Sequence, residues 1–283
     1  MKKQNLNYLP MLVMLPAITV GTLAMYLNHV PAAIYLQNIA CFAILSVSAY
    51  FLLENKSLCR QFQPKMVIMF CILALLLTFL LPSIEGVHRW IALGPIQLYV
   101  SAIVMPIVLI ALWSLIQKAQ IGQAILSVSC IVVLLTLQPD ASMVTAFSVT
   151  SIIMLWHKLA NLPRLCLLLF LGGITTVTWI FLDGLAPVAY VEGIFTWVLE
   201  LGSISTIIGI AALAILVFPF FFFPPKHKQI LSVCFGLFYS LLLLANSYGN
   251  FPVPLMGYGI SPIIGYFIAI MWFTKAKMQT FIN

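Results

Sequence analysis

Ten apolar runs, separated by short polar stretches, dominate the pattern along this chain. Most are close to the ~20 residues that a helix needs to cross a lipid bilayer. They lack the strict alternation of barrel strands, and lipid offers no hydrogen-bond partner to bare backbone, so each run is predicted to be a helix. The predicted segments are 8–27, 32–53, 66–81, 96–115, 122–137, 143–156, 165–181, 192–223, 230–244 and 255–273.

Two of these segments depart from the length of a simple span. Segment 143–156 is short, and segment 192–223 is too long for one crossing. We expect the first turns of 192–223 to lie in the membrane interface before the helix enters the bilayer.

Composition agrees with this pattern. Of the 283 residues, 63% are hydrophobic and only 7% are charged. An ordinary soluble domain carries about 25% charged residues, and a disordered chain has low hydrophobicity, so both classes are excluded. We therefore predict an all-α polytopic membrane protein with one domain over 1–283. So little chain lies outside the membrane that no nucleic-acid partner is expected.

Basic residues predict the orientation, because short basic loops stay in the cytoplasm. With ten crossings and a cytoplasmic N-terminus, twelve of the thirteen Lys and Arg residues fall inside, and the C-terminus is also cytoplasmic. Only Arg89 falls outside. The start of the chain resembles a signal peptide but is predicted to remain as the first span. The inside set is Lys2, Lys3, Lys56, Arg60, Lys65, Lys118, Lys158, Arg164, Lys226, Lys228, Lys275 and Lys277.

Familiar cofactor motifs are absent from the sequence. No CxxC pair or His/Cys cluster occurs, so neither zinc nor a disulfide framework is indicated. No Walker motif or GxGxxG occurs, so ATP-driven work and dinucleotide redox chemistry are not expected. Five of the six acids fall in or near outer segments. Either some of the few outer residues must simply be polar, or chemistry takes place on the outer face.

Three outer stretches differ from the ordinary apolar sequence of membrane-spanning helices. In 85–95, Arg89 beside Trp90 suits binding of a phosphate at the membrane interface. Alternatively, Arg89 forms an ion pair with Glu85, or its side chain snorkels to the interface. In 137–142, Asp140 either caps the next helix or is a partner for Arg89. In 250–262, three prolines and two glycines indicate either an interrupted helix that lines a cavity or a kinked, close-packed one.

Together these stretches resemble the SEDS family of membrane glycosyltransferases, which includes FtsW, RodA and SpoVE. The family pattern G-x-x-R-W-I-x-L-G-x-x-x-x-Q-P-S-E retains its first half here, but Tyr99, Val100 and Ala102 replace its Gln, Pro and Glu. The family's Q-P-D-x-G-T turn keeps its Gln, Pro and Asp, but its Gly-Thr falls on Ser142-Met143, and the late P-F-x-S-Y-G-G-S-S motif is partly met. The matching residues are Gly86, Arg89, Trp90, Ile91, Leu93, Gly94, Ser101, Gln138, Pro139, Asp140, Pro254, Tyr258, Gly259 and Ser261.

A further family stretch, D-F-I-F-A-x-x-x-E-E-x-G, carries the essential catalytic Asp. Alignment from Gly202 backward puts Glu200 on a family Glu and Val191 on the Asp, whereas a one-residue gap puts Glu192 there. The long outer loop before it in the family is reduced to residues 182–190.

The resemblance implies polymerisation of lipid II, an undecaprenyl pyrophosphate disaccharide-peptide, at the outer face of the bacterial cytoplasmic membrane. It implies Glu192, then Asp183, as catalytic base, with a class B penicillin-binding protein as partner in division or elongation. A resident metal is not assigned, although a divalent cation could assist. The substrate-binding residues that the resemblance implies are Arg89, Trp90, Asp140, Glu200, Tyr258 and Ser261.

Two other functions remain open. A catalytically degenerate relative would bind a lipid-linked precursor or scaffold cell-wall partners, which the lost motif residues favour. A transporter would show inverted repeats and polar residues at mid-membrane, and the helices show little of either.

Overall fold

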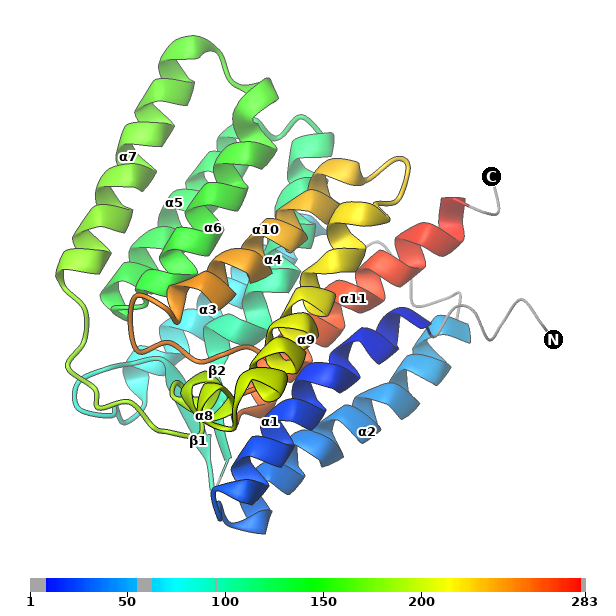
Figure 1. Cartoon of the computed structure of the whole chain (residues 1–283). Helices are drawn as coiled ribbons and strands as arrows, with labels where there is room; N and C mark the ends of the chain where they lie inside the picture. Colours follow the sequence, from blue (N-terminus) through cyan, green and yellow to red (C-terminus); the bar gives the residue numbers. More distant parts are fainter. Residues whose placement is uncertain (1–8, 55–62, 95, 281–283) are drawn as a thin grey trace. The chain divides into compact units, whose positions relative to one another are not determined.

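The computed structural model describes residues 9–54, 63–94 and 96–280, and these residues form eleven α-helices and one β-hairpin (Figure 1). They fall into two compact units. The first combines the two ends of the chain, Met1–Arg60 and Ala186–Asn283, and the second is the middle, Gln61–Leu185. The prediction of one domain over the whole chain stays a prediction.

The middle unit is an antiparallel set of five helices with a hairpin (Figure 1). Each helix packs against the next and against the next but one. Consequently the ends of α3, α5 and α7 lie together with the starts of α4 and α6. Its elements are α3 (Pro64–Leu80), β1 (Trp90–Leu93), β2 (Ile96–Tyr99), α4 (Val100–Gln117), α5 (Ile121–Leu137), α6 (Ala141–Leu155), η4 (Trp156–Lys158) and α7 (Asn161–Ile180).

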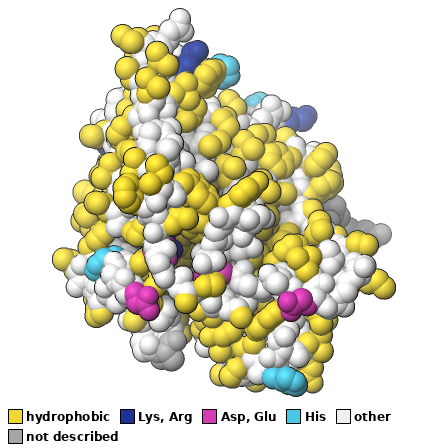
Figure 2. Space-filling view, turned by 60° about the vertical axis from the view of Figure 1, so that its left-hand side comes forward, with side chains coloured by type: hydrophobic (Ala, Val, Ile, Leu, Met, Phe, Trp, Pro, Cys, Tyr) yellow, Lys and Arg dark blue, Asp and Glu magenta, His cyan; other side chains and the backbone are white. Residues whose placement is uncertain are grey.

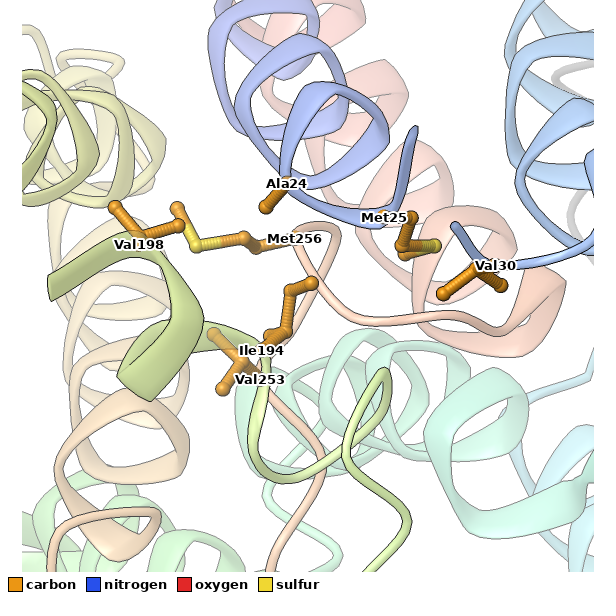
Figure 3. Packing of buried hydrophobic residues seen from close by; sticks show 7 residues of the cluster. All are labelled: Ala24, Met25, Val30, Ile194, Val198, Val253 and Met256. Atoms are coloured by element: carbon orange, nitrogen blue, oxygen red, sulfur yellow. The ribbon is translucent and has the colours of Figure 1, made fainter. Parts of the chain in front are cut away.

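The terminal unit holds the remaining helices. In it α1 packs against α2, α8 and α9, while α11 packs against α2 and α10 against α9. A cluster of buried side chains joins α1 and α8 to the loop before α11 (Figure 3). Its elements are η2 (Leu9–Met14), α1 (Leu15–Leu27), α2 (Ala32–Glu54), α8 (Ile194–Glu200), α9 (Ser203–Phe222), α10 (Gln229–Ala245) and α11 (Ile260–Thr280).

Every predicted apolar segment contains a helix, with three differences in extent. The long segment 192–223 divides into α8 and α9 at Gly202, whose φ of 110° is a left-handed conformation open to glycine. Residues 96–99 form strand β2 instead of the first turn of a helix. The last helix begins at Ile260, because the proline- and glycine-rich stretch before it forms a separate loop.

The chain is a multi-pass membrane protein by the length and composition of its helices. Five described segments are long and apolar enough to cross a bilayer, and three further apolar helices fall just below that length. Large hydrophobic side chains are exposed on many helices, and Figure 2 shows a face on which hydrophobic side chains far outnumber charged ones. Such a surface suits contact with lipid.

The count of ten crossings and the cytoplasmic termini stay predictions. Four of the basic residues used for the orientation, Lys2, Lys3, Lys56 and Arg60, lie outside the described residues. Within the middle unit, the exposed Lys118 and Lys158 lie in the α4–α5 and α6–α7 connections, at the end opposite Arg89. This placement is consistent with the predicted alternation.

Candidate functional site

Arg89 joins three separate connections of the middle unit. It directly precedes β1, and its side chain is 4% exposed. Its Nε donates to the Gln138 carbonyl at 2.9 Å, and its Nη2 donates to the Pro139 carbonyl and to Asp183 Oδ2. The hairpin is thereby fixed to the α5–α6 turn and to the segment after α7.

The ion pair of Arg89 differs from the one that local sequence suggests. Its partner is Asp183, 94 residues away, whereas Glu85 is exposed. Burial alone would lower the pKa of the Arg89 guanidinium, but the negative charges of Asp140 and Asp183 raise it above its ordinary value. Arg89 is therefore permanently charged, and its second terminal nitrogen, Nη1, takes no part in the three bonds above.

Asp140 caps α6, as one of the two interpretations of the sequence predicted. It is fully buried, and its Oδ1 accepts from the backbone N–H of Met143 and the hydroxyl of Ser142. Its Oδ2 accepts from the Tyr99 hydroxyl at 2.5 Å and from the Ser101 hydroxyl at 3.2 Å. Four donors bind the one carboxylate of Asp140, which acts on Arg89 through its charge and not through a direct bond.

Aromatic and amide groups complete this arrangement. The Gln138 side chain donates to Thr78 Oγ1 at 2.8 Å, which ties the α5–α6 turn to the end of α3. The Trp90 ring lies 6.1 Å from that of Tyr99 and 5.9 Å from the Arg89 guanidinium carbon. We call the set Arg89, Tyr99, Ser101, Gln138, Asp140 and Asp183 the Arg89 cluster.

Glu192 lies in the terminal unit, in the turn that precedes α8. Its Oε2 accepts from the backbone N–H of Val188 at 2.8 Å, and its carbonyl accepts from the Asn246 side chain at 2.8 Å. The side chain is half-buried. The bond from the Val188 N–H orients one oxygen of the Glu192 carboxylate, because both groups belong to the same turn. The bond from Asn246 fixes the backbone of this turn.

Tyr258 lies beside this turn, in the loop before α11. Its backbone N–H donates to the Tyr190 carbonyl at 2.8 Å, its ring meets that of Tyr190 edge-on at 5.9 Å, and its hydroxyl donates to Gln37 at 3.0 Å. Asn38 binds the same loop twice, through the Gly257 carbonyl and the Gly259 N–H. Residues 257–259 are thus closely packed, as one interpretation predicted, but they belong to a loop and not to a kinked helix.

The structure therefore separates the predicted site residues into two sets. Arg89, Asp140 and Asp183 come together in the middle unit. Glu192 and Tyr258 both lie in the terminal unit, where Tyr258 contacts Tyr190, two residues before Glu192. Glu200 is exposed at the far end of α8, and Ser261 is buried in the first turn of α11.

The described carboxylates of the middle unit are bound by protein donors and are not grouped as metal ligands. Among the residues that the structure describes, no group of three or more His, Cys, Asp and Glu side chains lies close enough to bind one. All four carboxylate bonds of Asp140 go to protein donors, while Asp183 accepts from Arg89 and from the Leu185 N–H.

Sequence reasoning missed several members of these sets. Tyr99 occupies a position where the family pattern is lost, yet its hydroxyl binds Asp140. Asn38 and Asn246, a polar residue within α2 and another just after α10, hold the loops of the terminal unit. Isolated amides in or beside apolar runs were the available signal, because a buried amide in a membrane protein needs a partner.

Comparison with known proteins supports the fold. No protein-family model matches the sequence, and no curated protein sequence matches it. Among solved structures, a point mutant of the Thermus thermophilus rod shape determining protein RodA matches with a TM-score of 0.72 at 15% identity, over 95% of this chain and 96% of that one.

Two further structures agree. Unmutated Thermus thermophilus RodA gives a TM-score of 0.68 at 16% identity, covering 95% of both chains. A chain from a peptidoglycan synthase complex that coordinates polymerization and crosslinking gives 0.68 at 15% identity, covering 97% of this chain and 98% of that one. Over nearly its whole length, this chain therefore has the fold of the SEDS protein RodA.

Proposed function

We propose that this protein is a SEDS-type peptidoglycan glycosyltransferase that polymerises lipid II at the outer face of the bacterial cytoplasmic membrane. The observation that carries the proposal is the RodA fold over 95% of the chain, with the retained Arg-Trp and Gln-Pro-Asp motifs placed together in it. A likeness at 15% identity establishes the fold only, so the activity rests on the residues themselves.

In the proposed reaction a sugar hydroxyl of one substrate attacks the anomeric carbon of the other. Glu192 accepts the hydroxyl proton as general base, a new glycosidic bond forms, and the bond to the lipid pyrophosphate breaks. The leaving pyrophosphate carries the electron pair away. Asp183 is the second candidate base, but its ion pair with Arg89 gives it a different task in the described structure.

Arg89 is the proposed contact of the leaving group. Its Nε and Nη2 are held by protein acceptors, which fixes the plane of the guanidinium, and Nη1 is the proposed donor to a phosphate oxygen. Guanidinium donors suit phosphate, and a preorganised donor stabilises developing charge without reorganisation. Substrate-binding roles are also proposed for Trp90 and Asp140 in the middle unit and for Glu200, Tyr258 and Ser261 in the terminal unit.

Polymerisation of labelled lipid II by the purified protein tests this function. Glu192→Gln keeps an oxygen that can accept from Val188 but removes the base, so product formation should fall by roughly 100-fold or more. The matched control is Glu85→Gln, an exposed acid before the hairpin, which should retain activity. Equal activity of Glu192→Gln and the unmutated protein would remove Glu192 from the mechanism.

A catalytically degenerate relative is the second candidate. The replaced Gln, Pro and Glu of the first motif and the placement of Val191 against the family Asp favour it. Such a protein would bind lipid II without forming glycan. Binding of labelled lipid II with no product, in the presence of an active transpeptidase partner, would identify this case.

The proposed partner is a class B penicillin-binding protein. The similar chain from a peptidoglycan synthase complex supports this choice, because that assembly joins polymerization with crosslinking. Co-purification of this protein with such a transpeptidase from a detergent extract is the expected result.

A further inference from the structure

The connection between α6 and α7 holds an arginine side chain in a fixed orientation. This connection lies at the end of the middle unit away from the hairpin (Figure 1). Arg164 lies in the first turn of α7, and its guanidinium carbon is 4.7 Å from the centre of the Trp156 ring. Its Nη2 donates to the Leu159 carbonyl at 2.8 Å. The aromatic contact and this bond together fix the plane of the guanidinium.

The Nε–H of this guanidinium lacks an acceptor. It is shielded from solvent, and no residue that the structure describes accepts its hydrogen bond. Buried donors in proteins nearly always have a partner, and an ion or water outside the chain is a common explanation where the chain offers none. The Nε–H of Arg164 therefore indicates an acceptor that the described residues do not supply.

The charges around Arg164 favour an anion as this acceptor. Residues 61–185 contain only three acids, all of which belong to the opposite end of the unit: Glu85, Asp140 and Asp183. The end that carries Arg164 has further basic residues: Lys65, Lys118, His157 and Lys158. The N-cap of α7 is Ala160, which has no capping side chain, so the first N–H groups of the helix add partial positive charge.

This basic end is continuous with a surface that suits lipid. The helix α7 is a candidate membrane span, and only 17% of its residues are buried. Leu162 and Leu165, in the first turns of α7, are 71% and 52% exposed, and Trp156 is 38% exposed. Tryptophan is typical of the headgroup level of a bilayer. An anion bound to Arg164 would thus have hydrocarbon directly beside it, as the phosphate of a phospholipid does.

We infer that Arg164 binds the phosphate of an anionic phospholipid, such as phosphatidylglycerol, at the start of α7. The guanidinium donates to phosphate oxygens, Lys158 adds positive charge, and the acyl chains lie along the exposed leucines of α7. Under the predicted orientation this end is cytoplasmic, and the cytoplasmic leaflet carries the negative surface potential that attracts basic segments. The site is separate from the Arg89 cluster and does not depend on the proposed polymerisation.

The test measures photolabelling by a phosphatidylglycerol that carries a diazirine on an acyl chain, close to the glycerol. The full-length protein is placed in phosphatidylcholine nanodiscs with a small fraction of this probe, so that both faces of the bilayer are sampled. Arg164→Gln removes the guanidinium charge, and Arg164→Lys keeps the charge without the planar donors. Lys118→Gln is the matched control, because it removes one exposed charge from the same end of the unit. Melting temperatures verify that every variant is folded.

Labels are expected in peptides that cover residues 156–168. Their yield should fall about tenfold in Arg164→Gln, because one charge-assisted hydrogen bond corresponds to about tenfold in affinity. It should fall about fivefold in Arg164→Lys, which lacks the planar pair of donors, and by less than about twofold in Lys118→Gln. Full labelling of Arg164→Lys, or an equal loss in Lys118→Gln, would show a general attraction by charge and overturn the inference.

Competition identifies the source of the phosphate. Unlabelled phosphatidylglycerol should lower the yield, and millimolar inorganic phosphate should leave it unchanged. Displacement of the probe by inorganic phosphate would show a site for a soluble anion, and labels spread evenly over the lipid-facing helices would show no site at all. Either result would overturn the inference. Because labelling is measured without lipid II, its outcome is independent of whether the protein forms glycan.

Discussion

Arg89 has three bonding partners from distant parts of the middle unit, so its replacement should lower the free energy of unfolding. Arg89→Ala leaves the Asp183 carboxylate without its ion pair and two backbone carbonyls without donors. We expect a loss of about 3–5 kcal/mol in the free energy of unfolding, the usual cost of breaking a buried pair. Thermal denaturation in detergent measures it.

The control for Arg89 is the exposed acid four residues before it. Glu85→Gln should change stability by less than about 0.5 kcal/mol, as surface substitutions do. The double variant Arg89→Met/Asp183→Leu should recover part of the loss, since it removes both charges. An Arg89→Ala protein as stable as Glu85→Gln would contradict the structural part of this account.

Tyr99 gives a second prediction at this scale. Tyr99→Phe removes the hydroxyl that donates to Asp140 and should cost about 1.5–3 kcal/mol of stability, the range for bonds to charged groups. Burial, and then the charge of Asp140, raise the Tyr99 pKa well above its ordinary value. The folded state thus holds the proton more tightly than the unfolded state.

The sign of the pH effect follows from this shift. Stability from the Tyr99 proton is complete below the unfolded pKa of about 10 and is lost as pH rises through the higher folded pKa. The difference between the unmutated protein and Tyr99→Phe should therefore stay constant up to about pH 10. A difference that disappears at neutral pH would show that Tyr99 is already ionised there.

Local sequence predicted some of these contacts and missed others. The Asp140 cap depends on residues only two or three positions away, so the turn pattern was sufficient to predict it. The Arg89–Asp183 pair depends on how the hairpin and α7 pack in three dimensions. Nothing near Arg89 in the sequence distinguishes Asp183 from the closer Glu85.

At the scale of elements, close backbone contacts position the loop before α11. A Cβ added to Gly21 of α1 would lie 1.9 Å from the Met256 carbonyl oxygen, and one added to Gly257 would lie 2.5 Å from that of Val191. Gly21→Ala and Gly257→Ala should each destabilise the terminal unit by about 1–3 kcal/mol, because backbone must move.

A glycine on α7 provides the matched control. A Cβ on Gly172 would meet nothing within 4 Å, and alanine is the better helix former by about 1 kcal/mol. Gly172→Ala should therefore leave the melting temperature unchanged or raise it. If Gly21→Ala melts like Gly172→Ala, α1 and the loop do not approach as closely as described.

Run length predicted the helices well but not their internal breaks. A continuous apolar run demands a helix in lipid, so the positions of α2, α5 and α10 follow from composition. The hairpin escaped prediction because residues 96–99 are largely apolar and merge with the run of α4. The excess length of segment 192–223 was noted, but one helix with its first turns in the interface was expected, and the structure has two helices that meet at Gly202.

At the scale of the whole molecule, the predicted orientation makes a direct prediction. In a variant whose six native cysteines are replaced, single cysteines at Glu85 and Tyr248 should react with a membrane-impermeant maleimide added outside intact cells. Cysteines at Lys118 and Lys158 should react only after permeabilisation, because basic connections remain in the cytoplasm. Outside labelling at Lys118 would contradict the ten-crossing arrangement.

The proposed activity of this protein is glycan formation from a lipid-linked precursor. The most direct measurement incubates the purified protein, in nanodiscs with its transpeptidase partner, with labelled lipid II, and counts glycan chains and released undecaprenyl pyrophosphate together. We predict a ladder of glycan products, with one pyrophosphate released for each new glycosidic bond. Bound but unreacted lipid II, with neither product nor pyrophosphate, would contradict it.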